Sequence, residues 1–156
     1  MPRPPDSTFQ RTVRLLAARP YSAAEVRGRL KLSGAAEGEI ADAISRAENL
    51  GYLDDNALAR ARSGLFLAQG YSIDLAARKL AQSGFDEVDA AAAVRSAAVG
   101  VTAEDLCRRA LEAKTKGPLP SDLATRRKLG RYLIRRGHDT QHIERLLGLP
   151  DDVEKS

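Results

Sequence analysis

Apolar residues recur at helical spacing in three similar segments of the chain. Residues 20–44 and 70–94 align without a gap at an offset of 50 positions, and a third copy follows at an offset of 53. Each copy contains a pair of apolar residues four positions apart, which share one face of a helix: Val26/Leu30, Ala76/Leu80 and Leu129/Leu133. The pattern predicts three copies of an amphipathic helix of about three turns.

Residues that start and stop helices bracket each apolar pair. A Ser or Thr that can accept hydrogen bonds from free backbone N–H groups precedes each pair: Ser22, Ser72 and Thr125. In the first copy Ser22 and Glu25 have the spacing of a capping box, whereas Ser121 or Asp122 could cap the third helix instead. A glycine that can end the helix in a left-handed conformation follows each Ser or Thr by 12 positions: Gly34, Gly84 and Gly137.

A further helix is expected on each side of these three helices. The helices before the caps should span about residues 8–18, 55–68 and 102–113, and those after the glycines about residues 37–49, 86–97 and 139–147. Each copy is then a unit of three helices with a small core, so the units should stack on one another. The predicted fold class is all-α, with three tandem three-helix repeats.

The repeats define the expected domain organisation. We place repeat 1 at residues 8–53, repeat 2 at residues 54–100 and repeat 3 at residues 101–149. The segment KTKGPLPSD, residues 114–122, contains Gly and Pro and is expected to form a longer loop inside repeat 3. Disorder is expected at residues 1–7 and 150–156.

Composition supports a helical chain and narrows the class of protein. The chain has no Trp and is 43% hydrophobic, with much of that content in the strong helix formers Ala and Leu. The single cysteine, Cys107, cannot form an internal disulfide and is expected in a helical core. No segment approaches the roughly 20 apolar residues of a membrane span, and the N-terminal MPRPPDSTFQ lacks a hydrophobic signal core. We therefore expect a cytoplasmic protein without membrane contact.

Charge is segregated along the sequence. Residues 1–36 hold seven Lys/Arg and two acidic residues, and residues 108–136 hold ten and two. Residues 37–107 between them hold six Lys/Arg and twelve acidic residues. The two basic blocks suit a polyanion or an acidic protein surface as partner.

The densest basic segment is ATRRKLGRYLIRRGH, residues 124–138. Arg127, Arg131 and Arg135 recur every four residues and form a stripe that faces away from Leu129 and Leu133 on a helix. Three more basic residues widen the charged side: Arg126, Lys128 and Arg136. This helix could dock by its leucines and present its arginines to phosphates or carboxylates. A solvated helix face is the alternative interpretation.

The motif GYLDD, residues 51–55, contains two adjacent carboxylates. Gly51 can stop one helix, Asp54 or Asp55 can cap the next, and Tyr52 and Leu53 are expected to pack at the seam. No third ligand, histidine or phosphate-binding loop accompanies the acids. We therefore interpret the motif as the junction between repeats 1 and 2, not as a catalytic pair.

Two histidines four residues apart, His138 and His142, are the other candidate site. The segment HDTQH lacks the glutamate of a zinc-protease motif, and two histidines do not complete a zinc site. His138 is expected to pack beside the end of the preceding helix. The sequence also contains none of the phosphate-loop, dinucleotide or nucleophile-elbow motifs. We predict that the protein is not an enzyme and holds no metal or cofactor.

Three segments of the chain together carry a family resemblance: LLAARPYSAAEVRGRL (15–30), GYLDDNALA (51–59) and LGRYLIRRGHDTQHIERLL (129–147). On these segments the sequence resembles the RecX family of bacterial recombination regulators. The resemblance spans about residues 8–148. It departs at Leu58, where the family usually has an aromatic residue, and in repeat 2, where only Arg78 and Lys79 are basic in AQGYSIDLAARKL.

The resemblance implies an elongated, curved body that binds the RecA recombinase along the groove of the RecA–DNA filament. It implies inhibition of RecA ATPase, strand exchange and co-protease activity, through blocked filament growth or a destabilised filament. Such an activity regulates DNA repair, homologous recombination and the SOS response. Family members also bind DNA, so single- or double-stranded DNA is a second implied partner. No cofactor or catalysis is implied, and we expect a monomer.

The candidate contacts to RecA or DNA are the basic residues of the three amphipathic helices. They are Arg27, Arg29, Lys31, Arg78, Lys79, Arg126, Arg127, Lys128, Arg131, Arg135 and Arg136. Repeat 3 and residues 11–31 should contribute most, because the middle of the chain is acidic. A helical DNA-binding module that acts without RecA is the alternative function, and an interaction scaffold without a nucleic-acid role is a third possibility.

Overall fold

The computed structural model describes residues 1 and 6–150, and these residues form nine helices and no strand. The first three helices are α1 (Thr8–Ala18), α2 (Ala23–Leu32) and α3 (Glu37–Asn49). The next three are α4 (Asp55–Ala68), α5 (Ile73–Gln82) and α6 (Glu87–Ala97). The last three are α7 (Ala103–Thr115), α8 (Leu123–Arg135) and α9 (Thr140–Leu147).

Each group of three helices has its own hydrophobic core. Leu30 and Ile40 are among the buried residues of the first core, Leu80 and Val94 of the second, and Leu133 of the third. All of the extensive helix–helix packing lies within a group. The prediction of an all-α protein with three three-helix repeats is confirmed.

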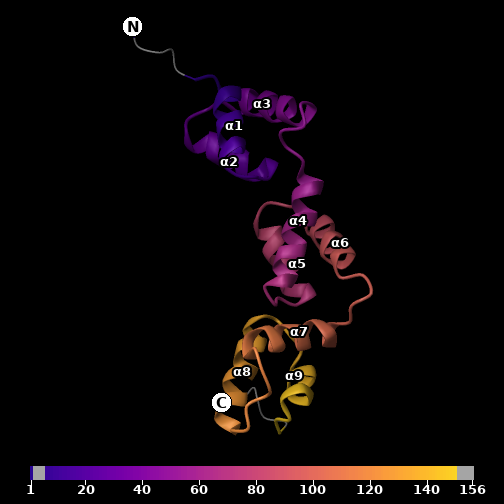
Figure 1. Cartoon of the computed structure of the whole chain (residues 1–156). Coiled ribbons are helices and arrows are strands. Elements are labelled where there is room, and N and C mark those ends of the chain that lie inside the picture. The colour runs from indigo at the N-terminus through magenta and orange to yellow at the C-terminus, as the bar shows by residue number, and fades with distance from the viewer. Residues whose placement is uncertain (2–5, 151–156) are drawn as a thin grey trace.

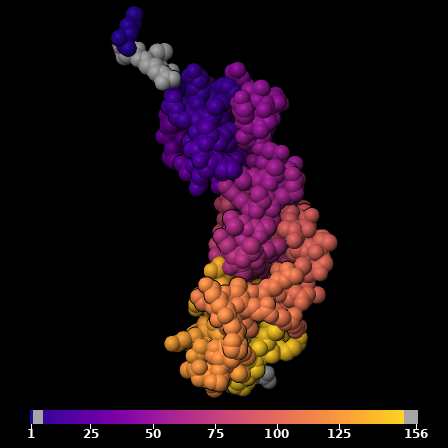
Figure 2. Space-filling view, viewed as in Figure 1, coloured from indigo at the N-terminus to yellow at the C-terminus, as the bar shows by residue number. Residues whose placement is uncertain are grey.

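The three repeats follow one another along an elongated body (Figure 1). Repeat 1 (α1–α3) and repeat 3 (α7–α9) lie at opposite ends, and repeat 2 (α4–α6) joins them. The body is bent, because repeat 2 lies to one side of the line between the other two repeats (Figure 2). The three repeats have separate hydrophobic cores rather than one shared core.

The middle helix of each repeat begins at a side-chain cap and ends at a left-handed glycine. The capping box of Ser22 and Glu25 is present at α2, and Ser72 caps α5. At α8 the cap is Asp122, so the helix starts about one turn earlier than Thr125 would allow. The Thr125 cap was therefore the wrong alternative and Asp122 the correct one. The three terminating glycines all have positive φ, as predicted: Gly34, Gly84 and Gly137.

The N-terminal boundary of order lies earlier than expected. Ser7 caps α1 with a capping box, and Asp6 forms an ion pair with Arg14. The prediction of disorder was therefore wrong for residues 6–7, because these polar groups satisfy free N–H groups and a guanidinium. The rest of that prediction, for residues 2–5 and 151–156, lies outside the described residues.

Repeats 1 and 2 meet where the end of α5 packs on the first turn of α2. The Ser22 hydroxyl donates a hydrogen bond to the Ser83 carbonyl at 3.0 Å. A Cβ atom added at Gly84 would lie only 2.4 Å from the Cβ of Ala24. Two constraints therefore require glycine at position 84. Its φ of 92° is positive, and α2 approaches too closely for a side chain.

Two carboxylates complete the same joint, one through a backbone hydrogen bond and one through an ion pair. The Asp55 carboxylate, at the start of α4, accepts a hydrogen bond from the Ala23 N–H at 2.9 Å. Arg62 of α4 donates to both Glu25 carboxylate oxygens, at 3.1 and 2.9 Å. Burial opposes ionisation of Glu25, but the hydrogen bonds from Arg62 and from the Ser22 N–H outweigh burial and lower its pKa. A bidentate pair of this kind fixes orientation as well as distance.

Repeats 2 and 3 meet by the same arrangement. The end of α8 packs on the first turn of α5, where the Ser72 N–H donates to the Arg136 carbonyl at 2.9 Å. A Cβ atom on Gly137 would lie 2.5 Å from the Ser72 hydroxyl and 2.8 Å from the Leu75 Cβ. The middle helices are thus joined end to end. The C-terminal end of α5 packs on the first turn of α2, and the C-terminal end of α8 packs on the first turn of α5.

Replacing Gly84 with alanine should destabilise the protein more than the matched change Gly34→Ala. Both glycines have positive φ, which costs an L-residue about 1–2 kcal/mol. Only at Gly84 does the added methyl group collide with another repeat, whereas nothing lies within 4 Å of a Cβ at Gly34. We expect an extra loss of about 1–3 kcal/mol in the free energy of unfolding, measured in urea. Equal losses for the two variants would contradict the role assigned to the joint.

Candidate functional site

All eleven candidate basic residues lie on the three joined middle helices or on their C-terminal caps. Arg27, Arg29 and Lys31 belong to α2, and Arg78 and Lys79 to α5. The other six belong to α8 and its cap: Arg126, Arg127, Lys128, Arg131, Arg135 and Arg136. The joints therefore bring residues from distant parts of the sequence onto one continuous line of helices. Eight of the eleven side chains are exposed.

Helix α8 has one buried and one basic side. Leu129 and Leu133 enter the core of repeat 3, while Arg127, Arg131 and Arg135 are exposed. Lys128 is exposed as well, and none of these four cations forms an ion pair with a carboxylate of residues 6–150. The arrangement matches the two-sided helix expected from the sequence. Its role in binding stays a prediction.

Two of the arginines on α8 are held by internal contacts. Arg126 donates from Nε to the Pro120 carbonyl at 2.6 Å and from a terminal nitrogen to the Leu147 carbonyl at 3.1 Å. It thereby ties the long loop and the end of α9 to α8. The Arg136 guanidinium lies 4.3 Å from the ring centroid of Tyr71, in repeat 2. These two residues have structural contacts that the sequence pattern did not reveal.

Several basic residues of repeats 1 and 2 form ion pairs or contacts with aromatic rings. Arg27 and Lys31 pair with Glu37 at 3.3 and 3.7 Å, in an exposed network. Exposed ion pairs of this kind contribute little to stability and exchange readily with other anions. The Arg29 guanidinium lies 4.7 Å from the centre of the Tyr21 ring, and Lys79 makes the equivalent contact in repeat 2.

The junction motif connects α3 to α4, and its five residues have different roles. Gly51 has a φ of 76°, and Leu53 is buried in the core of repeat 1. Asp54 caps α4, while the Asp55 carboxylate reaches across to α2. Tyr52, however, is 56% exposed, so the expectation that it packs into the seam is wrong. Leu53 packs into the core of repeat 1, which includes Ile40 and Ile44 of α3, while the tyrosine ring lies at the surface.

Cys107 and His138 are both buried, as expected. Burial raises the pKa of the Cys107 thiol to about 11, which keeps it protonated and unreactive near neutral pH. The Nε2 atom of His138 lies 2.8 Å from the Gly70 carbonyl, so this ring links repeat 3 to repeat 2. Within residues 6–150, no group of three or more His, Cys, Asp or Glu side chains is placed to hold a metal ion.

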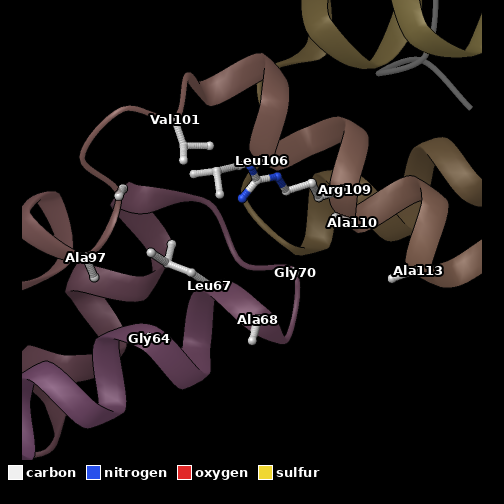
Figure 3. Close-up of a pocket in the computed structure, with 11 residues that line it drawn as sticks. Gly64, Leu67, Ala68, Gly70, Ala97, Val101, Leu106, Arg109, Ala110 and Ala113 are labelled. Carbon is white, nitrogen blue, oxygen red and sulfur yellow. The ribbon is translucent and has the colours of Figure 1, made fainter.

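A cavity of about 430 Å³ lies between repeats 2 and 3 (Figure 3). Leu67, Val101 and Leu106 form its apolar walls together with several Ala and Gly residues. Arg109 is the only charged residue in its lining, and its side chain lies beside Leu106. The cavity offers no paired carboxylates, nucleophile or base. The cavity lies at one edge of the contact between repeats 2 and 3. Gly70, which lines it, also forms the contact to His138 of repeat 3.

The helix bundles show no membrane segment. None of the helices between residues 6 and 150 combines the length and the hydropathy needed to cross a bilayer.

Comparisons with known proteins agree with the resemblance. Residues 9–46 match the model of the first three-helix domain of RecX. The regulatory protein RecX of Pseudomonas fluorescens is 31% identical over 135 residues, which cover 85% of this chain and 84% of that protein. The regulatory protein RecX of Chlorobaculum tepidum is 30% identical over 145 residues, which cover 92% and 88%.

A solved structure gives the same answer for the fold. The crystal structure of RecX from Lactobacillus salivarius superimposes with a TM-score of 0.67 at 15% sequence identity. The match covers 90% of this chain and 92% of that one. The three-repeat architecture is thus shared even where few side chains are.

Truncation of Leu53 and of Tyr52 should have very different effects on stability. Leu53→Ala removes a side chain that is only 4% exposed and should cost about 2–5 kcal/mol. Tyr52→Ala removes an exposed ring and should change the free energy of unfolding by about 0.5 kcal/mol or less. Chemical unfolding of the two variants checks this. If Tyr52→Ala lowered the free energy of unfolding as much as Leu53→Ala, Tyr52 would have to contribute to the packing between repeats 1 and 2.

Acidification should weaken the protein through His138. Burial lowers the pKa of this ring below its ordinary value of 6.5, and the neighbouring His142 adds to the effect. Below pH 6.5 the imidazole of His138 is protonated more readily in the unfolded chain than in the folded chain. The free energy of unfolding is therefore retained above pH 6.5 and falls as the pH drops below that value. Urea titrations above and below that pH should show the loss. The variant His138→Gln, which keeps a donor for Gly70, should show a smaller pH dependence.

Proposed function

Because the chain belongs to the RecX family of regulatory proteins, we propose that it binds the RecA–DNA filament and inhibits RecA. The observation that carries the proposal is the line of middle helices, which presents exposed basic side chains from one end of an elongated body to the other. A bent, extended surface of this kind suits a long, grooved polymer better than a compact ligand.

The basic residues supply the attraction to the filament. Arg127, Lys128, Arg131 and Arg135 face solvent without an acidic partner among residues 6–150. Arginine forms bidentate hydrogen bonds with both phosphates and carboxylates. The α8 surface therefore fits either the DNA backbone or an acidic surface of RecA. Repeat 1 adds cations that are only weakly engaged by Glu37.

Inhibition follows from occupancy rather than chemistry. A rigid body that spans neighbouring RecA subunits would hinder the addition of subunits and the movements that accompany ATP hydrolysis. RecA ATPase, strand exchange and co-protease activity would all fall together, which would restrain recombination and the SOS response. The protein would act in the cytoplasm as a monomer, without cofactor or catalytic step.

A second candidate function rests on α8 alone. Four exposed cations on one helix form a sufficient electrostatic surface for DNA phosphates even without RecA. Only Tyr132 lies among them, and it packs against the core of repeat 3, so stacking on single-stranded bases is not favoured. Backbone contacts to DNA of either form are the version of this function that the surface supports.

A titration of RecA ATPase on single-stranded DNA tests the proposal. The wild-type protein should lower the ATPase rate progressively as its concentration rises. The variant with Arg127, Arg131 and Arg135 replaced by alanine should need roughly tenfold more protein, because it lacks three charge contacts worth about 0.5 kcal/mol each. An unchanged ATPase rate at several-fold excess of wild-type protein would contradict inhibition.

The control variant removes the same charge elsewhere. Arg46, Arg60 and Arg95 are exposed arginines outside the middle helices, and their replacement by alanine should leave inhibition close to wild type. Fluorescence anisotropy with DNA alone separates the two functions. Affinity that falls steeply with salt, with a slope that flattens by about 0.7–0.9 for each lost phosphate contact, would support direct DNA binding by α8.

A further inference from the structure

At the joint between repeats 1 and 2, repeat 2 binds the first turn of α2 through two groups. The first is Ser83 and Gly84 at the end of α5, on which the turn packs. The second is Arg62 of α4, which donates a hydrogen bond to a carboxylate of the turn. The turn supplies Ser22 at its cap and Glu25 three residues later.

Repeat 1, at one end of the body, contains residues equivalent to Arg62, Ser83 and Gly84. Thr12 and Ser63 are both fully buried, and each hydroxyl donates to the carbonyl four residues before it, at Thr8 and Ala59. These two equivalent contacts align α1 with α4 at an offset of 51 positions. The same offset places Arg11 at the position of Arg62.

The end of α2 supplies the other two residues. Ser33 and Gly34 occupy the positions of Ser83 and Gly84, at the repeat offset of 50. We call Arg11, Leu32, Ser33 and Gly34 the N-terminal docking face. It belongs to the repeat at the end of the body that no other repeat covers.

Leu32, Ser33 and Gly34 of the N-terminal docking face are exposed to solvent. Nothing lies within 4 Å of a Cβ built on Gly34, and Leu32 is 91% exposed. At the position of Leu32, repeat 2 has the polar Gln82, so the fold does not require an apolar residue there. An open cavity of about 610 Å³ beside α1 is lined by Arg11, Arg29 and Leu32.

Internal contacts hold Arg11 of this face and the nearby Arg29 in place. Arg11 donates to the Ser33 hydroxyl at 2.8 Å, to the Ser33 carbonyl at 3.3 Å and to the Thr8 hydroxyl at 3.1 Å. The Thr8 hydroxyl in turn donates to the Glu39 carboxylate at 3.1 Å, and these contacts orient the Arg11 guanidinium. The Arg29 guanidinium rests on the Tyr21 ring. Neither arginine forms an ion pair with any acidic residue of the described chain. The side chains are ordered before binding, which reduces the entropy that an occupant must overcome.

A second copy of this chain is a poor occupant. The exposed end of its own array is the start of α8, where the Asp122 cap is followed by a first turn without an acidic residue and then by Arg126, Arg127 and Lys128. Helix α8 also starts about one turn earlier than α2 and α5 relative to the glycine that ends it. Charge repulsion and the extra turn both oppose head-to-tail docking.

We propose that the N-terminal docking face binds the acidic first turn of a helix in a partner protein. The expected turn has Ser or Thr as its cap, a small residue above Gly34 and a Glu three residues after the cap, held by Arg11. Leu32 packs against an apolar residue of the same helix. This surface goes beyond the filament contacts proposed above, because it lies at the other end of the molecule from α8 and recognises the capped first turn of a helix.

The probe is a stapled helical peptide that begins with the sequence of residues 21–25, Tyr-Ser-Ala-Ala-Glu, and continues as an Ala/Gln helix. It is titrated into the full-length, ¹⁵N-labelled protein, without RecA or DNA. We expect amide shifts centred on Arg11 and on Leu32–Gly34. The control peptide with Gln in place of that Glu should bind about tenfold more weakly, because the ionic contact is lost.

Protein variants locate the site. Leu32→Glu lies at an exposed position and should weaken binding about tenfold through lost apolar contact and charge repulsion. The matched variant Leu123→Glu, at the opposite end of the molecule, should bind as wild type. Equal affinity for both peptides, shifts confined to repeat 3, or displacement of the peptide by a single-stranded oligonucleotide would overturn the proposal. So would concentration-dependent self-association that Leu32→Glu abolishes.

Because neither RecA nor DNA is present, failure of this experiment leaves the ATPase result untouched. An absent effect on ATPase would likewise leave peptide binding intact.

Discussion

The close contact between a helix-ending glycine and the first turn of the preceding middle helix organises the molecule. Each repeat has a small, separate core, so the cores alone do not decide how the repeats sit on one another. That decision falls to Gly84 and Gly137, where a single methyl group would collide with the neighbouring repeat. The bend of the body and the alignment of its basic helices both depend on these two contacts.

Arginine serves two purposes in this structure. Arg62 and Arg126 are engaged by Glu25 and by backbone carbonyls, and they lock a joint and a loop. Arg127 and Arg131 have no such partners in the described chain and keep their charge available to a polyanion. Both kinds occur in similar sequence surroundings. A guanidinium suits both roles, because its planar donors fit a carboxylate, a carbonyl or a phosphate equally well.

Local physical chemistry made most of the fold predictable. Helix spacing, the capping box at Ser22 and the left-handed glycines act within a few residues, so they can be recognised in sequence. The third cap was ambiguous between Thr125, Ser121 and Asp122, because all three can cap and they lie within about one turn of each other. The exposure of Tyr52 was not predictable, since Tyr52 and Leu53 are adjacent residues with large apolar groups, and only the tertiary packing leaves the first exposed and the second buried.

The sequence by itself determined nine helices in three units, the buried Cys107 and His138, and the two-sided pattern of α8. These features follow from periodicity and from the preferences of single residues. Only the tertiary structure decided which cations are free, because the partners of Arg11, Arg62 and Arg126 come from other helices or from a loop. It also decided that α2, α5 and α8 lie end to end, since that arrangement depends on contacts between residues about 60 positions apart.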